Sequence, residues 1–239
     1  MKALLLTVFI IPVLLYTPNE RPMEKSPVVL ELFTSQGCSS CPPADRLLSE
    51  LASEDIIALS YHVDYWNYIG WKDPFSKESY TDLQRQYSKK FNSSTIYTPQ
   101  LVLNGKTHVV GSDRNAVARK IEAYGTSKGT AGINIANAKT VDGFVEFNYN
   151  ASGQFEDQTL RIILVIKERK TSVKRGENRN RNLVNSNIVI NEQRFSLKEN
   201  SGEGRIAIPD IVKSSDELSL VLILQDDNLD INGGTIKSL

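Results

Sequence analysis

Cys38 and Cys41 are the two cysteines of the 239-residue chain, and two serines separate them. The apolar run at 28–33 predicts a strand before them, and Pro42 and Pro43 predict a helix after them, because proline is tolerated in a first helical turn. The positive end of a helix dipole favours thiolate over thiol. Cys38 is therefore the candidate nucleophile of thiol–disulfide exchange, and Cys41 is the candidate resolving cysteine.

The same spacing also occurs in structural disulfides and in metal sites. The rival interpretation is a binding module with a structural disulfide, whose aromatic segment at 61–71 and second domain recognise a protein partner or a soft metal ion such as copper. Thiolates paired with His62 would suit such an ion. Two histidines in the whole chain make a dedicated metal site the weaker alternative. We therefore assign no metal ligand and expect no cofactor.

Glu31 interrupts the apolar strand seven residues before Cys38. A carboxylate in a strand that is buried on both faces is costly unless it has a partner or a role. We therefore consider Glu31 a possible proton acceptor for Cys41. A solvated strand edge, or a structural hydrogen bond to the cysteine loop, is the alternative.

Thr98 and Pro99 precede a predicted strand at 100–103, at the point where thioredoxin-like chains place a cis-proline opposite the cysteines. Cis X–Pro bonds are uncommon and usually serve a tight local geometry. In that geometry the backbone of Thr98 offers N–H and C=O groups to an extended substrate, as in strand addition. An ordinary trans-proline at the start of a strand is the alternative.

The segment 61–71 holds both tryptophans and five aromatic residues in all. We interpret it either as a cap on the domain core or as a wall of a substrate groove. His62, Asp64 and Trp66 are its candidate substrate-binding residues, and His62 and Asp64 are also candidates for acid–base help. For His62 a simple hydrogen bond at a strand end is the alternative.

Hydrophobic periodicity predicts the order strand, helix, strand, helix, strand, strand, helix up to Gly125, and about seven strands after 129. The predicted second helix has Asp73 as its N-cap, and the third is capped near Ser112 and Asp113. The fold class that follows is α/β, with a thioredoxin-like domain at 26–128 and an all-β, immunoglobulin-like sandwich domain at 129–239.

Charge and hydropathy limit the partners and the location. Lysine plus arginine equals aspartate plus glutamate at 28 each, and no basic stripe is evident, which argues against nucleic acid. Lys2 and the apolar run at 3–16 predict a signal peptide or an N-terminal anchor within 1–20. We therefore expect a periplasmic or extracellular protein whose partners are exported protein thiols or disulfides. Contact with a membrane is expected only through the possible anchor.

Three strings carry a family resemblance: ELFTSQGCSSCPPAD at 31–45, YHVDYW at 61–66, and YTPQ at 97–100 followed by Asn104-Gly105. The later residues Gly176 to Asn178, Arg181, Leu183 and Asn187 extend it into the second half. The sequence resembles the secreted thioredoxin-like proteins of the domain of unknown function 1223, with departures at Asn180, where a glycine is usual, and at Ile190, where a basic residue is usual. The resemblance implies a thioredoxin-like fold and export, and it leaves substrate and activity open.

Overall fold

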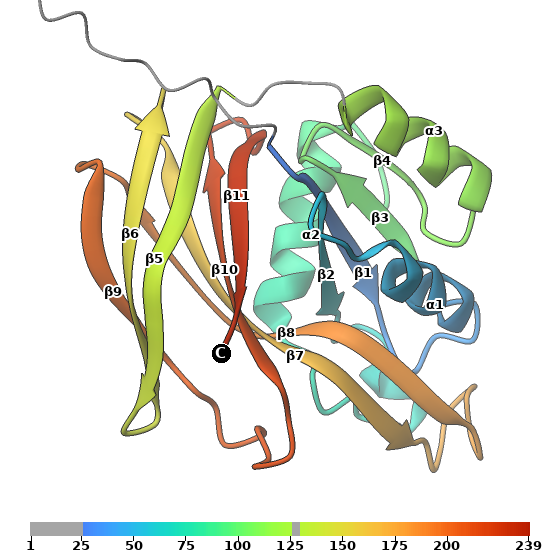
Figure 1. The fold of residues 1–239 in the computed structure, drawn as a ribbon. Coiled ribbons are helices and arrows are strands. Elements are labelled where there is room, and N and C mark those ends of the chain that lie inside the picture. Colours follow the sequence, from blue (N-terminus) through green and yellow to red (C-terminus); the bar gives the residue numbers. More distant parts are fainter. Residues whose placement is uncertain (1–25, 126–129) are drawn as a thin grey trace, which may run out of the picture.

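The computed structural model describes residues 26–125 and 130–239 (Figure 1). In these residues the chain forms eleven strands and three α-helices. The elements of the first half are β1 (Val28–Thr34), α1 (Pro42–Leu51), β2 (Ile56–His62), the 3₁₀ turn η1 (Asn67–Ile69), α2 (Glu78–Lys90), β3 (Gln100–Leu103), β4 (Thr107–Val110) and α3 (Arg114–Gly125). Those of the second half are β5 (Ala131–Val141), β6 (Phe144–Gly153), β7 (Thr159–Ser172), β8 (Asn182–Ser196), β9 (Ser201–Ala207), β10 (Leu218–Gln225) and β11 (Ile231–Ser238).

The strands form two sheets. The larger sheet has eight strands in the order β11-β10-β7-β8-β2-β1-β3-β4, and the smaller has the order β5-β6-β9. The larger sheet is mixed, because β1 and β8 both run parallel to β2 while its other neighbouring strands are antiparallel. Ser60 of β2 lies opposite Ile188 of β8, and this pairing joins the two halves of the chain.

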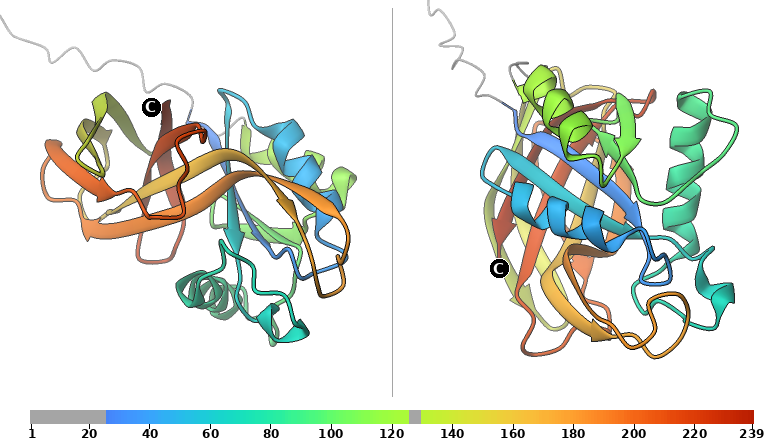
Figure 2. Two further views of the ribbon diagram at one scale, coloured as in Figure 1. Left: turned by 90° about the horizontal axis from the view of Figure 1, so that it is seen from below. Right: turned by 90° about the vertical axis from the view of Figure 1, so that its right-hand side faces the viewer.

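Alternate residues of the central strand β1 face different layers, as the pleat requires. Leu30 and Leu32 pack with α1, whereas Val29 and Phe33 pack with α2 on the other face. The small sheet covers β7 and β10 farther along the large sheet. The long strands β7 and β8 curve from the small sheet at one end to α1 at the other (Figure 2).

The predicted fold class, a thioredoxin-like domain followed by an immunoglobulin-like sandwich, is wrong. The described chain is mostly β, and strands of both halves form one continuous sheet. Seven strands do follow residue 129, but β7, β8, β10 and β11 belong to the large sheet. Periodicity identifies which residues alternate in a strand and cannot identify the strand's partner.

Most local predictions for the first half are confirmed, including the order of elements and the strand at 100–103. Asp113 caps α3, because its carboxylate accepts the N–H of Ala116 at 3.0 Å. The prediction that Asp73 caps the second helix is wrong, since α2 begins at Glu78. The Asp73 carboxylate instead binds the backbone N–H of Gln36 and the ring of His62.

Two predictions fall outside the described residues: the signal peptide or anchor at 1–20, and the domain boundary near 128. Across residues 26–125 and 130–239, none of the helices has both the length and the hydropathy needed to cross a bilayer.

Candidate functional site

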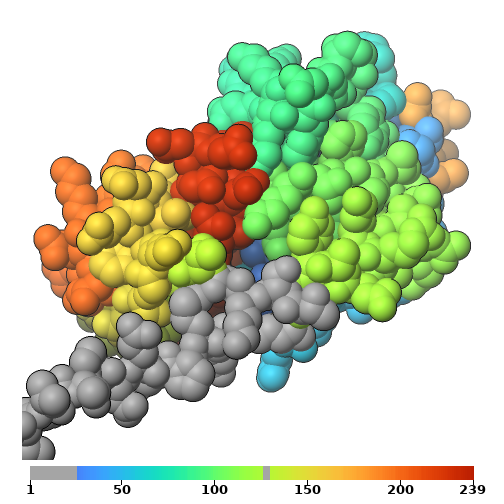
Figure 3. All heavy atoms as spheres, turned by 90° about the horizontal axis from the view of Figure 1, so that it is seen from above, coloured from blue at the N-terminus to red at the C-terminus, as the bar shows by residue number. Residues whose placement is uncertain are grey.

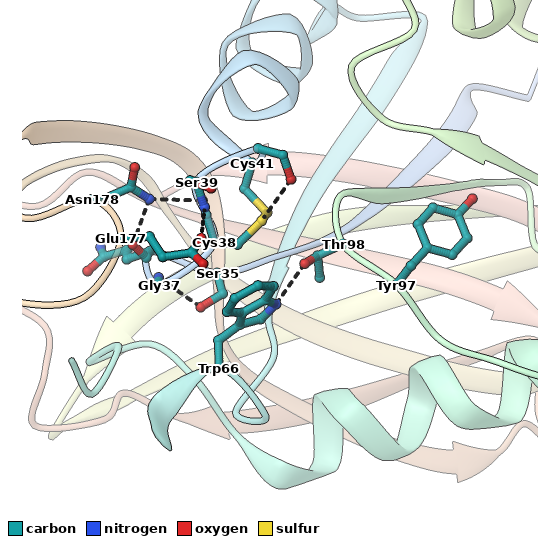
Figure 4. Close-up of a disulfide and its surroundings, with 12 residues drawn as sticks. Ser35, Gly37, Cys38, Ser39, Cys41, Trp66, Tyr97, Thr98, Glu177 and Asn178 are labelled. Atoms are coloured by element: carbon teal, nitrogen blue, oxygen red, sulfur yellow. Dashed lines mark hydrogen bonds between the residues drawn. A yellow bond between two sulfur atoms is a disulfide. The ribbon is translucent and has the colours of Figure 1, made fainter. Parts of the chain in front are cut away.

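Cys38 and Cys41 form a disulfide at the start of α1 (Figure 4). Cys41 is the N-cap residue, and its carbonyl accepts the N–H groups of Ala44 at 2.9 Å and Asp45 at 3.1 Å. Both cysteines are fully buried. The disulfide therefore lies at a helix N-terminus, where the unpaired N–H groups and the dipole favour negative charge on sulfur.

Ser39 and Ser40, the two residues between the cysteines, are exposed to solvent. The Ser40 hydroxyl lies 3.4 Å from the sulfur of Cys38. A molecule approaching the disulfide from solvent thus meets these two serines first.

Gln36 holds the turn that leads into Cys38, and its side chain is fully buried. The backbone N–H of Gln36 donates to Asp73 Oδ2 at 2.8 Å, and its side-chain amide donates to Asn185 Oδ1 at 3.1 Å. Its Oε1 accepts the indole N–H of Trp71 at 3.2 Å. These bonds fix the turn before the disulfide to two separate segments of the chain, the one that holds Trp71 and Asp73 and the strand β8.

The loop between β7 and β8 clamps the same turn from the second half of the chain. The buried amide of Asn178 donates to the carbonyls of Gln36 at 3.0 Å and Cys38 at 2.8 Å. The Glu177 carboxylate accepts the N–H of Ser39 at 3.0 Å, and the side chain and then the backbone of Ser39 lower the pKa of Glu177 by hydrogen bonding. Both residues belong to the Gly176–Asn178 string found in the sequence, but their contact with the cysteines was not predicted.

Trp66 and Thr98 lie on the other side of the disulfide (Figure 4). The Trp66 indole N–H donates to Thr98 Oγ1 at 2.8 Å. The predicted cis bond between Thr98 and Pro99 is confirmed. A Cβ atom built on Gly111 would lie 3.2 Å from Cβ of Ala44 and 3.5 Å from Cβ of Pro99, so the proline loop packs beside the first turn of α1.

His62 and Asp64, the other two predicted substrate-binding residues, form hydrogen bonds within the protein. His62 is fully buried, with Nδ1 2.7 Å from Asp73 Oδ2. Burial disfavours the imidazolium, but the charges of Asp73 and Asp45 and the hydrogen bond to Asp73 outweigh it and raise the pKa of His62. Asp64 accepts the hydroxyl of Thr81 on α2 at 2.6 Å. In the described residues we find no group of three or more His, Cys, Asp or Glu side chains that could hold a metal ion.

Glu31 points to the face of β1 that packs against α2, away from α1. Its carboxylate lies 2.8 Å from the Arg161 guanidinium and accepts the Tyr87 hydroxyl at 2.5 Å. Leu30 and Leu32, its neighbours in sequence, face α1. The structure thus does not bring Glu31 to the cysteine side of the strand.

The buried carboxylate on the α1 side is that of Asp45. It lies one helical turn after Cys41, so the two side chains share a face of α1. Within the described residues, its Oδ1 atom has no hydrogen-bond partner. Burial raises the pKa of Asp45 to about 6, although the charge of His62 and the nearby Thr34 hydroxyl favour the ionised form. One sequence signal pointed to it: an aspartate on the apolar face shared with Leu48.

Replacing Asn178 with alanine should loosen the clamp on the cysteine loop. The buried carbonyl of Gln36 would lose its donor, which costs about 1–3 kcal/mol in the free energy of unfolding, and the carbonyl of Cys38 would keep only the N–H of Cys41. Urea unfolding measures this loss, and the rate of disulfide reduction by dithiothreitol should rise with it. Asn182→Ala is the matched control, because Asn182 is exposed at the start of β8. Equal effects of the two substitutions would contradict a clamp.

Comparison with known proteins places the chain in a family. The family model described as "Protein of unknown function (DUF1223)" matches residues 29–225. A crystal structure of a protein from Agrobacterium tumefaciens is similar, with a TM-score of 0.66 and 27% identity, over 90% of this chain and 95% of that chain.

Other solved structures are similar only in part. A β-glucosidase from Kluyveromyces marxianus has a TM-score of 0.24 and 12% identity, over 52% of this chain and 17% of that chain. A GH3 β-glucosidase from Bifidobacterium adolescentis has the same two values, over 65% of this chain and 20% of that chain. Such scores support no inference about fold or activity. No curated protein matches the sequence. Since the family model spans most of its length, the chain belongs to the DUF1223 family.

Proposed function

We propose that this protein carries out thiol–disulfide exchange with cysteines of exported proteins, through Cys38 and Cys41. The observation that supports this function best is the place of the disulfide, which joins Cys38 to Cys41, the N-cap residue of α1. The helix N-terminus stabilises a thiolate at this position. A stabilised thiolate leaves a disulfide readily, and a larger fraction of the thiol is ionised and able to attack.

The short loop that the disulfide closes also supports a working couple. The cysteines are three positions apart, and the entropy removed from the unfolded chain grows with the length of the closed loop. For so short a loop the expected stabilisation is about 2 kcal/mol, against about 4.7 kcal/mol for a loop of roughly 100 residues. A disulfide at this spacing is therefore an inefficient structural cross-link.

The exchange proceeds through a mixed disulfide. A partner thiolate attacks Sγ of Cys38, the Cys38–Cys41 bond breaks, and Cys41 leaves as a thiolate that takes up a proton. A second partner thiolate then attacks the partner sulfur of the mixed disulfide, which forms the partner's disulfide and releases Cys38 as a thiolate. Two electrons pass from the partner dithiol to the protein, and the reverse sequence reduces a partner disulfide.

Asp45 is the group that we propose exchanges the proton with Cys41. It lies one turn along the same helix face, its Oδ1 has no partner in the described chain, and its pKa is raised to about 6. A carboxyl group in that range both accepts and donates protons near neutral pH. Glu31, the proton acceptor expected from the sequence, is engaged with Arg161 on the other face of β1.

Full burial of both cysteines favours a second candidate, a binding module whose disulfide is structural. The reduction potential of the Cys38–Cys41 pair decides between the two. A value below about −300 mV is typical of a structural disulfide, and a higher value is typical of a redox-active one. We expect the higher value.

The Cys41→Ser variant should trap partners, because Cys38 then forms a mixed disulfide that no resolving cysteine can release. We expect disulfide-linked partners on non-reducing gels of cell-envelope fractions, and their loss on reduction. The variant that also carries Cys38→Ser is the control and should trap nothing. No adducts together with a potential below about −300 mV would refute the exchange function.

A further inference from the structure

Positive charge is concentrated in one hairpin, although the net charge of the whole chain is zero. Lysine plus arginine and aspartate plus glutamate both number 28 in the whole sequence. We define the basic hairpin as residues 170–181, the adjoining ends of β7 and β8 with their connecting loop. Five of its twelve residues are basic, all five are exposed, and one is acidic. The basic residues are Lys170, Lys174, Arg175, Arg179 and Arg181.

These positive charges are not neutralised within the described chain. Over residues 26–125 and 130–239, none of the five takes part in a salt bridge. Lys174 donates to the hydroxyl of Ser172, and Arg181 donates to Oδ1 of Asn178. The acidic member, Glu177, binds the N–H of Ser39. The hairpin therefore presents a positive field to solvent.

The basic hairpin is in direct contact with the loop that holds the disulfide. Asn178 binds the carbonyl of Cys38, and Glu177 binds the neighbouring N–H of Ser39. A Cβ atom built on Gly176 would lie 3.1 Å from Ile69 Cδ1 and 3.3 Å from Trp71 Cβ, so the loop also packs on the aromatic segment. Seen from above, its orange tip lies beside the blue residues of the first half (Figure 3).

We propose that the basic hairpin is the docking surface for acidic polypeptide segments whose cysteines exchange with the Cys38–Cys41 pair. This inference rests on the proposed exchange function and names the substrate class. An extended chain advances about 3.3 Å per residue, so residues a few positions from a cysteine at Ser39 and Ser40 reach the hairpin. Carboxylates there meet arginine guanidiniums, which bind them in bidentate pairs, and the positive field raises the rate of encounter.

The position of the hairpin selects a polypeptide over the other anions that bind lysine and arginine. A surface that binds a membrane or a nucleic acid needs many phosphate contacts. Its affinity would gain nothing from the hydrogen bonds that hold this hairpin beside a disulfide. A polypeptide can bring a cysteine and carboxylates together in one segment. The two features of the site then act on one partner.

Three dithiol peptides of equal length, with cysteines flanked by aspartates, by serines or by lysines, test the proposal with the full-length oxidised protein. Each exchange rate is divided by that peptide's rate with a neutral small-molecule disulfide, which removes differences in thiol reactivity. At low ionic strength we expect the acidic peptide to react about 10-fold or more faster than the basic one. The ratio should approach one at about 1 M salt, where the Debye length is about 3 Å.

Charge reversal in the hairpin should remove this preference. The variant R175E/R179E should lose or invert the ratio of acidic to basic peptide, while its rate with the serine peptide stays within about twofold. The matched control K106E/K198E reverses two exposed lysines, one in the turn after β3 and one after β8, both outside the hairpin. It should keep the wild-type ratio.

The outcomes separate the two proposals. If none of the three peptides reacts, the exchange function is refuted. If all three react at equal rates, only the docking inference is refuted. Anionic phospholipid vesicles and duplex DNA are assayed in parallel. The inference would also be overturned if the wild-type protein bound the vesicles or the DNA, R175E/R179E did not bind them, and the three peptides reacted at equal rates.

Discussion

Replacing Arg161 with methionine is expected to lower the free energy of unfolding by about 3–5 kcal/mol, the usual cost of removing one partner from a buried ion pair. The Arg161 guanidinium is fully buried between Glu31 at 2.8 Å and Glu192 at 2.9 Å, and it donates to the Tyr61 hydroxyl at 2.8 Å. Methionine keeps much of the volume but leaves the Glu31 carboxylate as a buried charge without a cation.

A double variant distinguishes the lost charge pair from lost packing. R161M/E31Q removes both charges and keeps a hydrogen-bonding group beside Tyr87, so it should recover most of the stability. Glu192 retains Arg194, which lies 2.6 Å away. Urea unfolding of the wild type, both single variants and the double variant gives the coupling energy. If R161M/E31Q is as unstable as R161M, the loss comes from packing and the ion pair is not its cause.

The pH dependence of stability follows from the same charges. Burial alone would raise the pKa of Glu192, but Arg161, Arg194 and the Tyr61 hydroxyl outweigh it and lower the pKa to about 2. A depressed carboxylate pKa stabilises the folded state above the unfolded pKa of 4.5, and this stabilisation is lost as pH falls through about 2. R161M should therefore lose less stability than the wild type between pH 5 and 3.

The Arg161 network also shows what the sequence could reveal and what it could not. A carboxylate inside an apolar strand correctly marked Glu31 as a residue that needs a partner. That partner lies on β7, in the half for which the sequence predicts a separate sandwich. Local pattern cannot predict so distant a pairing, and this is also why it missed the continuous sheet through β2 and β8.

The sequence predicts those parts of the site that are formed by residues close together in the chain. The disulfide at the start of α1 follows from local sequence, and the cis bond before Pro99 from the likeness to thioredoxin-like chains. The clamp by Glu177 and Asn178 does not, because it depends on how β7 and β8 approach the cysteine loop. Asn180 in the same loop has a φ of 64°, a left-handed conformation that asparagine adopts more readily than most residues.

Asp45→Asn should have opposite effects on stability and on exchange. The pKa of Asp45 rises from 3.8 to about 6 on burial, so the folded state loses stability as pH rises through about 6. A shift of about two units corresponds to roughly 3 kcal/mol at high pH, since one unit is about 1.4 kcal/mol. Asparagine removes this cost. The variant should unfold at a higher temperature than the wild type at pH 8, by a margin that shrinks toward pH 4.

The same substitution should slow the step in which Cys41 attacks a mixed disulfide, because the proton of its thiol loses an acceptor. General acid–base help is typically worth 10²–10⁴-fold, so a loss in that range is expected at pH 7, while attack on Cys38 changes little. The wild-type rate should rise with pH through about 6, and the variant should lack this rise. Single-turnover kinetics with a neutral model peptide, at a series of pH values, measures both steps.

A variant on the exposed side of the same helix provides the control. Glu50 lies on α1 and pairs with Arg114 at the surface, so Glu50→Gln removes a carboxylate without touching the buried face. It should leave the resolving step and its pH profile unchanged. If Asp45→Asn instead lowered the melting temperature and slowed both steps equally, Asp45 would be a structural residue of the cysteine helix. An unchanged resolving rate would remove Asp45 from the mechanism, whatever its position on the helix face that it shares with Cys41.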